Sequence, residues 1–192
     1  GPDVGEPIGR HMDIDAVSFT GSTETGRRFL RYAAESNLKE VTLEMGGKNP
    51  AVVLDDAENL DRVAAHIVNG AFWNMGENCS ASSRLIVQKG VKEDLLKRIV
   101  AHAREWPMGD PLDPVNRVGA LVSKAHYDKV CSYLEKGQKV VMGGKADKGF
   151  VEPTVIEVTR EAKQAREEIF GPVLSVLTVD SFDEAIALAN NT

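Results

Sequence analysis

Cys79 stands in a stretch of small and polar residues where a thiol could act as a nucleophile. Residues 74–83 read NMGENCSASS, so small side chains follow the cysteine directly. Such neighbours leave room for a substrate carbon to approach the sulfur, and a thiolate is a strong nucleophile. A free cysteine is also often a small buried residue that only packs. From this loop alone, both interpretations stay open.

Glu44 is a second group that could do chemistry. It lies near the end of a β-rich run, residues 40–45, just ahead of Gly46 and Gly47. A carboxylate in this position can serve as a general base or can simply be solvated, and the local pattern does not choose between the two. Because glycine tolerates positive φ, the glycine pair predicts a chain reversal or a domain junction.

A third segment joins a strand to a helix through glycine. The strand-like run 15–20 leads into Gly21 and Ser22, and a helical pattern with apolar Phe29 follows. This geometry offers backbone N–H groups to an anionic ligand. The spacing is not the GxGxxG fingerprint, so the segment alone predicts only a tight strand-to-helix turn. We expect Thr23 to cap the helix.

Elements that would position these residues alternate along the chain. Strand-like runs are expected at 50–54, 84–88, 139–142, 152–158 and 173–179. Helices are expected before residue 11, at 59–73, 91–106 and 123–135, and after Ser181. Ser123 and Ser181 would cap the last two of these helices. This alternation predicts an α/β fold whose sheet contains parallel strands.

Composition excludes several classes of protein. The chain of 192 residues has 42% hydrophobic and 27% charged residues and a net charge of −6, as expected for a globular protein without a nucleic-acid surface. No apolar run approaches the ~20 residues of a membrane span, and no leader pattern is present. Two cysteines without a disulfide framework indicate a reducing, cytoplasmic location, and four scattered histidines predict no metal site.

Taken together, four segments resemble motifs of the aldehyde dehydrogenase superfamily. Residues 19–26 (FTGSTETG) resemble its cofactor loop, 43–48 (LEMGGK) the segment of the general base, 74–79 (NMGENC) the nucleophile loop, and 167–172 (EEIFGP) the motif that reaches the nicotinamide half of NAD. The four segments follow the family order. The resemblance covers essentially the whole chain.

The resemblance implies a division into two domains within a longer protein. Residues 1–46 would be the C-terminal segment of the NAD-binding domain, a partial Rossmann-like segment. Residues 47–192 would be the catalytic domain, incomplete at its C-terminus, with a parallel-rich sheet flanked by helices. We expect the preceding part of the protein to hold an oxyanion-binding asparagine and a ribose-binding lysine, and the following part an oligomerisation strand.

The resemblance also implies roles for particular residues. Cys79 would attack the aldehyde to form a thiohemiacetal, and oxidation by NAD (or NADP) would leave a thioester. Glu44 would activate the water that hydrolyses this thioester. Gly21 and Ser22 would lie near the dinucleotide. The cofactor motif adds Glu168, which would bind the nicotinamide ribose, and Phe170, which would pack beside the nicotinamide; no metal is implied.

The expected partner is a small-molecule aldehyde, with no nucleic acid or membrane partner, and the full-length protein would be a homodimer or homotetramer. Two alternatives remain. One is a CoA-acylating enzyme, which Glu44 argues against because that route needs no water-activating base. The other is a truncated, catalytically inactive domain. We expect the isolated chain to be inactive or weakly active, with at most an esterase activity that depends on Cys79.

Overall fold

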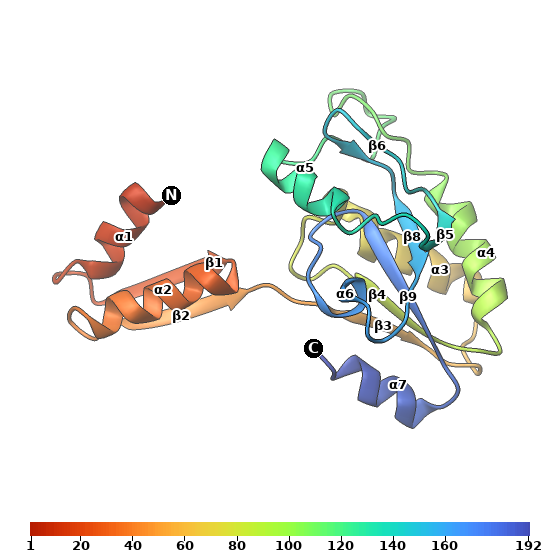
Figure 1. Cartoon of the computed structure of the whole chain (residues 1–192), viewed down its shortest axis with the longest axis horizontal. Helices are drawn as coiled ribbons and strands as arrows, with labels where there is room; N and C mark the ends of the chain where they lie inside the picture. Colours follow the sequence, from red (N-terminus) through yellow and green to blue (C-terminus); the bar gives the residue numbers. More distant parts are fainter. The chain divides into compact units, whose positions relative to one another are not determined.

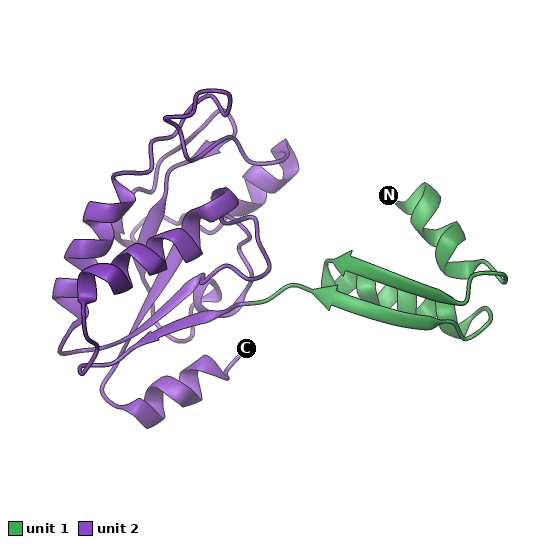
Figure 2. Ribbon diagram, turned by 180° about the vertical axis from the view of Figure 1, so that it is seen from behind, with its two compact units in different colours: residues 1–47 green, residues 48–192 purple.

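The computed structural model describes residues 1–192 and divides into two compact units. We call Gly1–Gly47 the N-terminal unit and Lys48–Thr192 the C-terminal unit (Figure 2).

The N-terminal unit pairs two parallel strands and covers one of their faces with a helix. Its elements are α1 (Pro2–Arg10), β1 (Ala16–Gly21), α2 (Thr23–Ala34) and β2 (Glu40–Met45) (Figure 1). Alternate strand residues are half-buried, as a sheet with one covered face requires. Phe19 of β1 packs on Phe29 of α2, with ring centroids 4.9 Å apart. A Cβ at Gly26 would lie 2.6 Å from the Met45 sulfur, so glycine allows α2 to approach β2 closely.

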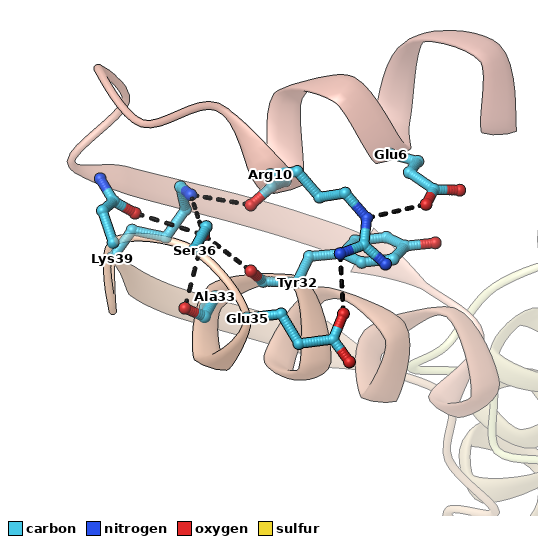
Figure 3. A network of polar contacts seen from close by, with 9 residues as sticks. Glu6, Arg10, Tyr32, Ala33, Glu35, Ser36 and Lys39 are labelled. Carbon is cyan, nitrogen blue, oxygen red and sulfur yellow. Dashed lines mark hydrogen bonds and ion pairs between the residues drawn. The ribbon is translucent and has the colours of Figure 1, made fainter.

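Polar contacts fasten α1 to α2 and to the turn that follows it (Figure 3). The Arg10 guanidinium donates to Glu6 at 2.8 Å and to Glu35 at 2.7 Å, and it lies over the ring of Tyr32. The Lys39 ammonium is buried and donates to the Gly9 carbonyl at 2.7 Å. The Arg10–Glu35 and Lys39–Gly9 contacts join residues 25 and 30 positions apart, so the short α1 is held by tertiary contacts as well as by its own hydrogen bonds.

The C-terminal unit is built on a five-stranded sheet in the order β3-β4-β9-β8-β5. Its strands are β3 (Pro50–Val53), β4 (Arg84–Gln88), β5 (Lys139–Met142), β8 (Thr154–Glu157) and β9 (Val173–Val179), and only the β5–β8 pair is antiparallel. The central strands β4 and β9 are buried almost throughout, which is typical of parallel strands covered on both faces. The predicted α/β fold with a parallel-rich sheet is confirmed.

Helices cover both faces of this sheet. Leu85 and Val87 of β4 face α3 (Leu60–Phe72) and α4 (Lys92–Ala103), while Ile86 between them belongs to a separate core on the opposite face. That opposite face carries α5 (Lys124–Cys131), α6 (Lys163–Arg166) and α7 (Phe182–Ala189) (Figure 1). The result is a three-layer α/β unit.

Several predicted boundaries are wrong, although the order of the elements agrees. Ser22, not Thr23, caps α2, since its hydroxyl accepts the Thr25 N–H at 3.2 Å. The expected caps Ser123 and Ser181 are confirmed. The helices predicted at 91–106 and 123–135 are shorter than expected. The sequence patterns also did not predict the small hairpin of β6 (Ala146–Asp147) and β7 (Phe150–Val151), the one-turn helix α6, or the 3-10 turn η1 (Trp73–Gly76).

None of the helices combines the length and the apolar character needed to cross a membrane.

Arg84 connects the start of the central sheet to the end of α7. Its side chain is buried and donates to the carbonyl oxygens of Lys48 at 2.9 Å, Leu188 at 3.1 Å and Ala189 at 2.9 Å. The last turn of a helix has carbonyls without helical partners, and a cation there is favourable. Burial lowers the pKa of the guanidinium, but three acceptors satisfy its donors.

We predict that Arg84→Met lowers the free energy of unfolding of the C-terminal unit by about 3 kcal/mol, because three buried carbonyls lose their donor. Urea denaturation followed by tryptophan fluorescence measures this, since both tryptophans, Trp73 and Trp106, lie in this unit. The control is Arg98→Met, which removes an exposed ion pair to Asp94 and should cost less than about 1 kcal/mol. Equal effects of the two substitutions would contradict the assignment.

Candidate active site

The predicted site residues of the C-terminal unit gather at the amino ends of its parallel strands. The nucleophile loop precedes β4, and residues 167–172 directly precede β9. Asn49, which was not predicted as a site residue, directly precedes β3. The amino ends of neighbouring parallel strands lie at one edge of a sheet, so segments distant in sequence meet there. Many open α/β sheets bind ligands at the opposite, carboxyl edge.

The nucleophile loop begins with a left-handed turn. Asn74, Met75 and Gly76 have φ values of 52°, 56° and 67°. The Asn74 amide donates to the Glu77 carbonyl at 2.9 Å, and the Glu77 N–H donates to the Asn74 carbonyl at 2.9 Å. Left-handed backbone costs a residue such as methionine on the order of 1–2 kcal/mol, whereas asparagine adopts it more readily, so Met75 keeps this conformation only where its surroundings hold it.

Gly76 is where those surroundings act most closely. A Cβ at this position would lie 2.3 Å from the Gly171 carbonyl oxygen, a distance that no side chain tolerates. The nucleophile loop therefore rests directly on the 167–172 segment, and only glycine allows this approach. Two of the four motifs are thus in van der Waals contact.

Cys79 is exposed and forms no disulfide, and its thiol lies 3.9 Å from the Asn78 side-chain oxygen. The Asn49 amide donates to the Cys79 carbonyl at 2.8 Å, which fixes this peptide on one side. The Cys79 N–H donates to no acceptor in the protein, so it is available to an oxygen on a substrate carbon bound to the sulfur. Cys131, in contrast, is half-buried beside Val130 of α5, which agrees with a packing role.

Glu168 and Phe170 are both half-buried in the 167–172 segment. Phe170 has φ 59°, a further left-handed residue with a side chain. Its carbonyl accepts a hydrogen bond from the His126 ring at 2.6 Å, and the Glu168 carbonyl accepts one from Lys129 at 3.1 Å. Both donors belong to α5, so this helix holds the backbone of the segment.

In the N-terminal unit, Gly21, Ser22 and Glu44 lie at the carboxyl ends of β1 and β2. Thr20 pairs with Glu44 in the parallel register, and Gly21 follows Thr20. All of the predicted residues here are exposed, and Glu44 lies on the strand face opposite α2. The structure thus groups the predicted residues within each unit. The pairing of Glu44 with Cys79 stays a prediction from the resemblance.

Lys48 is a buried cation that the sequence patterns did not predict, and the charges of Glu168 and Glu167 act on it. Its side chain is buried, and its ammonium nitrogen has no hydrogen-bond partner. Burial and, secondarily, the charge of Arg84 lower the pKa of Lys48 to about 8, while Glu168 opposes the shift. A buried amine next to the cofactor motif is therefore able to lose its proton near neutral pH.

Asn49, Glu77 and His126 were also missed. Their contacts join residues 30, 45 and 44 positions apart, for the Asn49–Cys79, Glu77–Val122 and His126–Phe170 hydrogen bonds. No local periodicity signals such pairs. No group of three or more His, Cys, Asp or Glu side chains is arranged to hold a metal ion.

Comparison with known proteins decides the family. The sequence profile of the aldehyde dehydrogenase family matches residues 1–192. The chain belongs to this family. It is 64% identical over 198 residues to an aminoacetaldehyde dehydrogenase of Pseudomonas aeruginosa, a match that covers 100% of the chain and 40% of that protein.

Solved structures of aldehyde dehydrogenases agree with this result. The γ-glutamyl-γ-aminobutyraldehyde dehydrogenase of Burkholderia cenocepacia superposes with a TM-score of 0.94 at 46% identity, covering 98% of the chain and 40% of that structure. An indole-3-acetaldehyde dehydrogenase in complex with NAD+ gives a TM-score of 0.95 at 43% identity, with the same coverage. The chain thus spans about 40% of the length of the aldehyde dehydrogenases it matches.

The buried Lys48 predicts a stability that rises with pH. Between pH 8 and 10.5 the unfolded chain binds more protons than the folded one, so the free energy of unfolding should increase by roughly 3 kcal/mol across this range. Lys48→Met should abolish the increase and raise stability at pH 7, because no charge is then buried. Urea denaturation at several pH values measures both effects.

The control for this measurement is Lys97→Met, which replaces an exposed lysine of α4 and should leave the pH dependence intact. A Lys48→Met protein with an unchanged pH dependence would show that the ammonium is not desolvated.

Proposed function

We propose that the chain is part of a longer NAD(P)-dependent aldehyde dehydrogenase that oxidises an aldehyde to a carboxylic acid through Cys79. The observation that carries the proposal is the exposed Cys79 thiol with an unused backbone N–H, in a loop resting on the 167–172 segment. Residues 1–46 would belong to the NAD-binding domain and 47–192 to the catalytic domain. The division of the chain near Gly47 supports this assignment.

The residues present fit a dinucleotide. β1 ends at Gly21, and Ser22 caps the twelve-residue α2, so a helix N-terminus with exposed residues follows a strand directly. Such an N-terminus offers unpaired N–H groups and a favourable dipole to a phosphate group. Glu168 and Phe170 would serve the nicotinamide end. When bound, NAD(P)+ supplies the hydride acceptor.

Cys79 would act first. Its thiolate adds to the aldehyde carbon, and the carbonyl electron pair moves to the oxygen, which the Cys79 N–H then stabilises. The hydrogen on this carbon departs as hydride, and the oxygen electron pair re-forms the carbonyl. The product of this step is a thioester on Cys79. Asn49 contributes by holding the Cys79 carbonyl and therefore the orientation of the loop.

Glu44 would act second. Its carboxylate takes a proton from water, and the water oxygen attacks the thioester carbon. The carbon–sulfur bond breaks, the carboxylic acid leaves, and the thiolate of Cys79 returns. This role is supported by the resemblance of residues 43–48 to the general-base segment of the family.

We further propose an amino-aldehyde as the first substrate to test, because one similar protein is named an aminoacetaldehyde dehydrogenase and another is named for the γ-glutamyl amide of an aminobutyraldehyde. The complete protein is proposed to be a homodimer or homotetramer, as the resemblance to the family implies. The proposed location is the cytoplasm, with which two unpaired cysteines agree.

Removal of the Cys79 thiol tests its role as the nucleophile. In the complete protein, Cys79→Ser should lower kcat for aldehyde oxidation by a factor of about 1,000 or more, because a hydroxyl without an adjacent base is a poor nucleophile. NADH formation with aminoacetaldehyde measures this. Cys131→Ser is the matched control and should retain activity, since Cys131 lies in the packed face of α5. Full activity of Cys79→Ser would refute the mechanism.

Removal of the Glu44 charge tests its role as the general base. Glu44→Gln should leave acylation intact and slow thioester hydrolysis by about 100-fold. Stopped-flow spectroscopy should therefore record a rapid burst of one NADH per site, followed by slow turnover. Glu40→Gln, on the same exposed face of β2, is the control and should behave as the wild type. If the wild type instead forms acyl-CoA and no free acid, the protein is the CoA-acylating alternative.

A further inference from the structure

The His126 side chain sits between the nucleophile loop and the 167–172 segment. Its Nε2 lies 2.6 Å from the Phe170 carbonyl oxygen and 3.3 Å from the Glu77 carboxylate, and both side chains are largely buried, with 15% and 9% exposed. Both neighbours are acceptors, so Nε2 carries the proton. The imidazole thus donates to the Phe170 carbonyl and lies within ion-pair distance of the Glu77 carboxylate.

Glu77 fixes His126 from the side of the nucleophile loop. It directly follows Gly76, and its carboxylate also accepts the Val122 N–H at 3.1 Å. The same oxygen therefore binds the chain ahead of α5 and a side chain on the first turns of α5. A displacement of the nucleophile loop would disturb both contacts.

Side chains of α5 and of the turn after it form three hydrogen bonds with the 167–172 segment. His126 donates to the Phe170 carbonyl, Lys129 to the Glu168 carbonyl, and the Tyr133 hydroxyl to the Glu167 carboxylate at 2.7 Å. Spacings of three and four residues place such side chains on the same side of a helix. The His126 and Phe170 rings also lie in a T-shaped arrangement, with centroids 5.8 Å apart.

Phe170 requires such support. Its φ of 59° is one that a residue with a side chain adopts only where neighbours hold it. The hydrogen bond from His126 acts on the carbonyl of this same residue. Release of the bond would free Phe170 to leave the left-handed region and would move the adjacent Gly171, on which Gly76 rests.

We propose that His126 is a positioning residue for the cofactor: held by Glu77, it fixes the backbone of Phe170, and through it the segment that carries Glu168. This inference rests on the proposed function in that the segment serves NAD(P)+. It assigns to His126 no contact with the substrate or with the reacting atoms. The consequence is that cofactor affinity depends on a histidine of α5 that is paired with the nucleophile loop.

The test uses three variants of the complete protein. His126→Leu removes the donor, His126→Gln keeps a side-chain N–H donor of similar reach, and His102→Leu is the matched control. His102 lies on α4 and pairs with the exposed Asp61 carboxylate, away from the site. Hydrogen–deuterium exchange of residues 167–172 and the KM values for NAD+ and aldehyde are measured for each variant.

For His126→Leu we expect about tenfold faster exchange in residues 167–172 and about tenfold higher KM for NAD+. The loss of one buried hydrogen bond corresponds to a factor of about this size. The KM for aldehyde should change less than twofold. His126→Gln should restore both quantities, and His102→Leu should match the wild type. Unchanged exchange in His126→Leu, or faster exchange with an unchanged KM for NAD+, would overturn the proposal.

Two further results would also bear on the proposal, namely a global loss of stability in His126→Leu and an inactive wild type. If exchange accelerates throughout the C-terminal unit of His126→Leu, His126→Asn becomes the deciding variant, because its shorter amide is polar but cannot reach the Phe170 carbonyl. Failure of His126→Asn to reproduce the local effect overturns the proposal. If the wild type oxidises no aldehyde, the proposed function is wrong. The exchange data then still test whether His126 stabilises the backbone of residues 167–172.

Discussion

The close approach of Gly76 to the Gly171 carbonyl is the constraint on which the site in the C-terminal unit depends. Gly171 in turn lies against Val130 of α5, where a Cβ would come within 2.7 Å of the valine side chain. Loop, segment and helix are thus stacked without room for a side chain at either glycine. This stacking fixes the position of the left-handed turn that precedes Cys79. It also explains why residues with positive φ occur on both sides of the contact, Met75 in the loop and Phe170 in the segment.

Two buried cations at the same edge of the sheet differ in their hydrogen bonding. Each of the three side-chain nitrogens of Arg84 donates to a carbonyl oxygen, one of Lys48 and two at the end of α7. Lys48, its neighbour, has no acceptor, and its pKa falls to about 8. A flexible point charge with a single nitrogen loses its proton more easily than a planar guanidinium with a fixed fork of donors. Only one of the two therefore provides a titratable group near the proposed site.

Local patterns predicted the elements well where one signal dominated. The apolar runs of β4 and β9, and the serines at 123 and 181, were identified from composition and position alone. Prediction was wrong where two signals competed, as at Ser22 and Thr23, which are both good capping residues. The 3-10 turn η1 was not predicted, because Met75 adopts a left-handed backbone that its side chain does not favour and that the contact of Gly76 with Gly171 stabilises.

The sequence by itself determined the α/β class, the order of the four motifs and the chemical types of the proposed site residues, because strand and helix periodicities and motif letters are local properties. Only the tertiary structure decided that Asn49 holds the Cys79 carbonyl and that His126, fixed by Glu77, holds Phe170. These partners are 30 or more residues apart. They meet because the strand order β3-β4-β9-β8-β5 brings the amino ends of β3, β4 and β9 to one edge, and that order depends on packing between the sheet and its helices rather than on any local pattern.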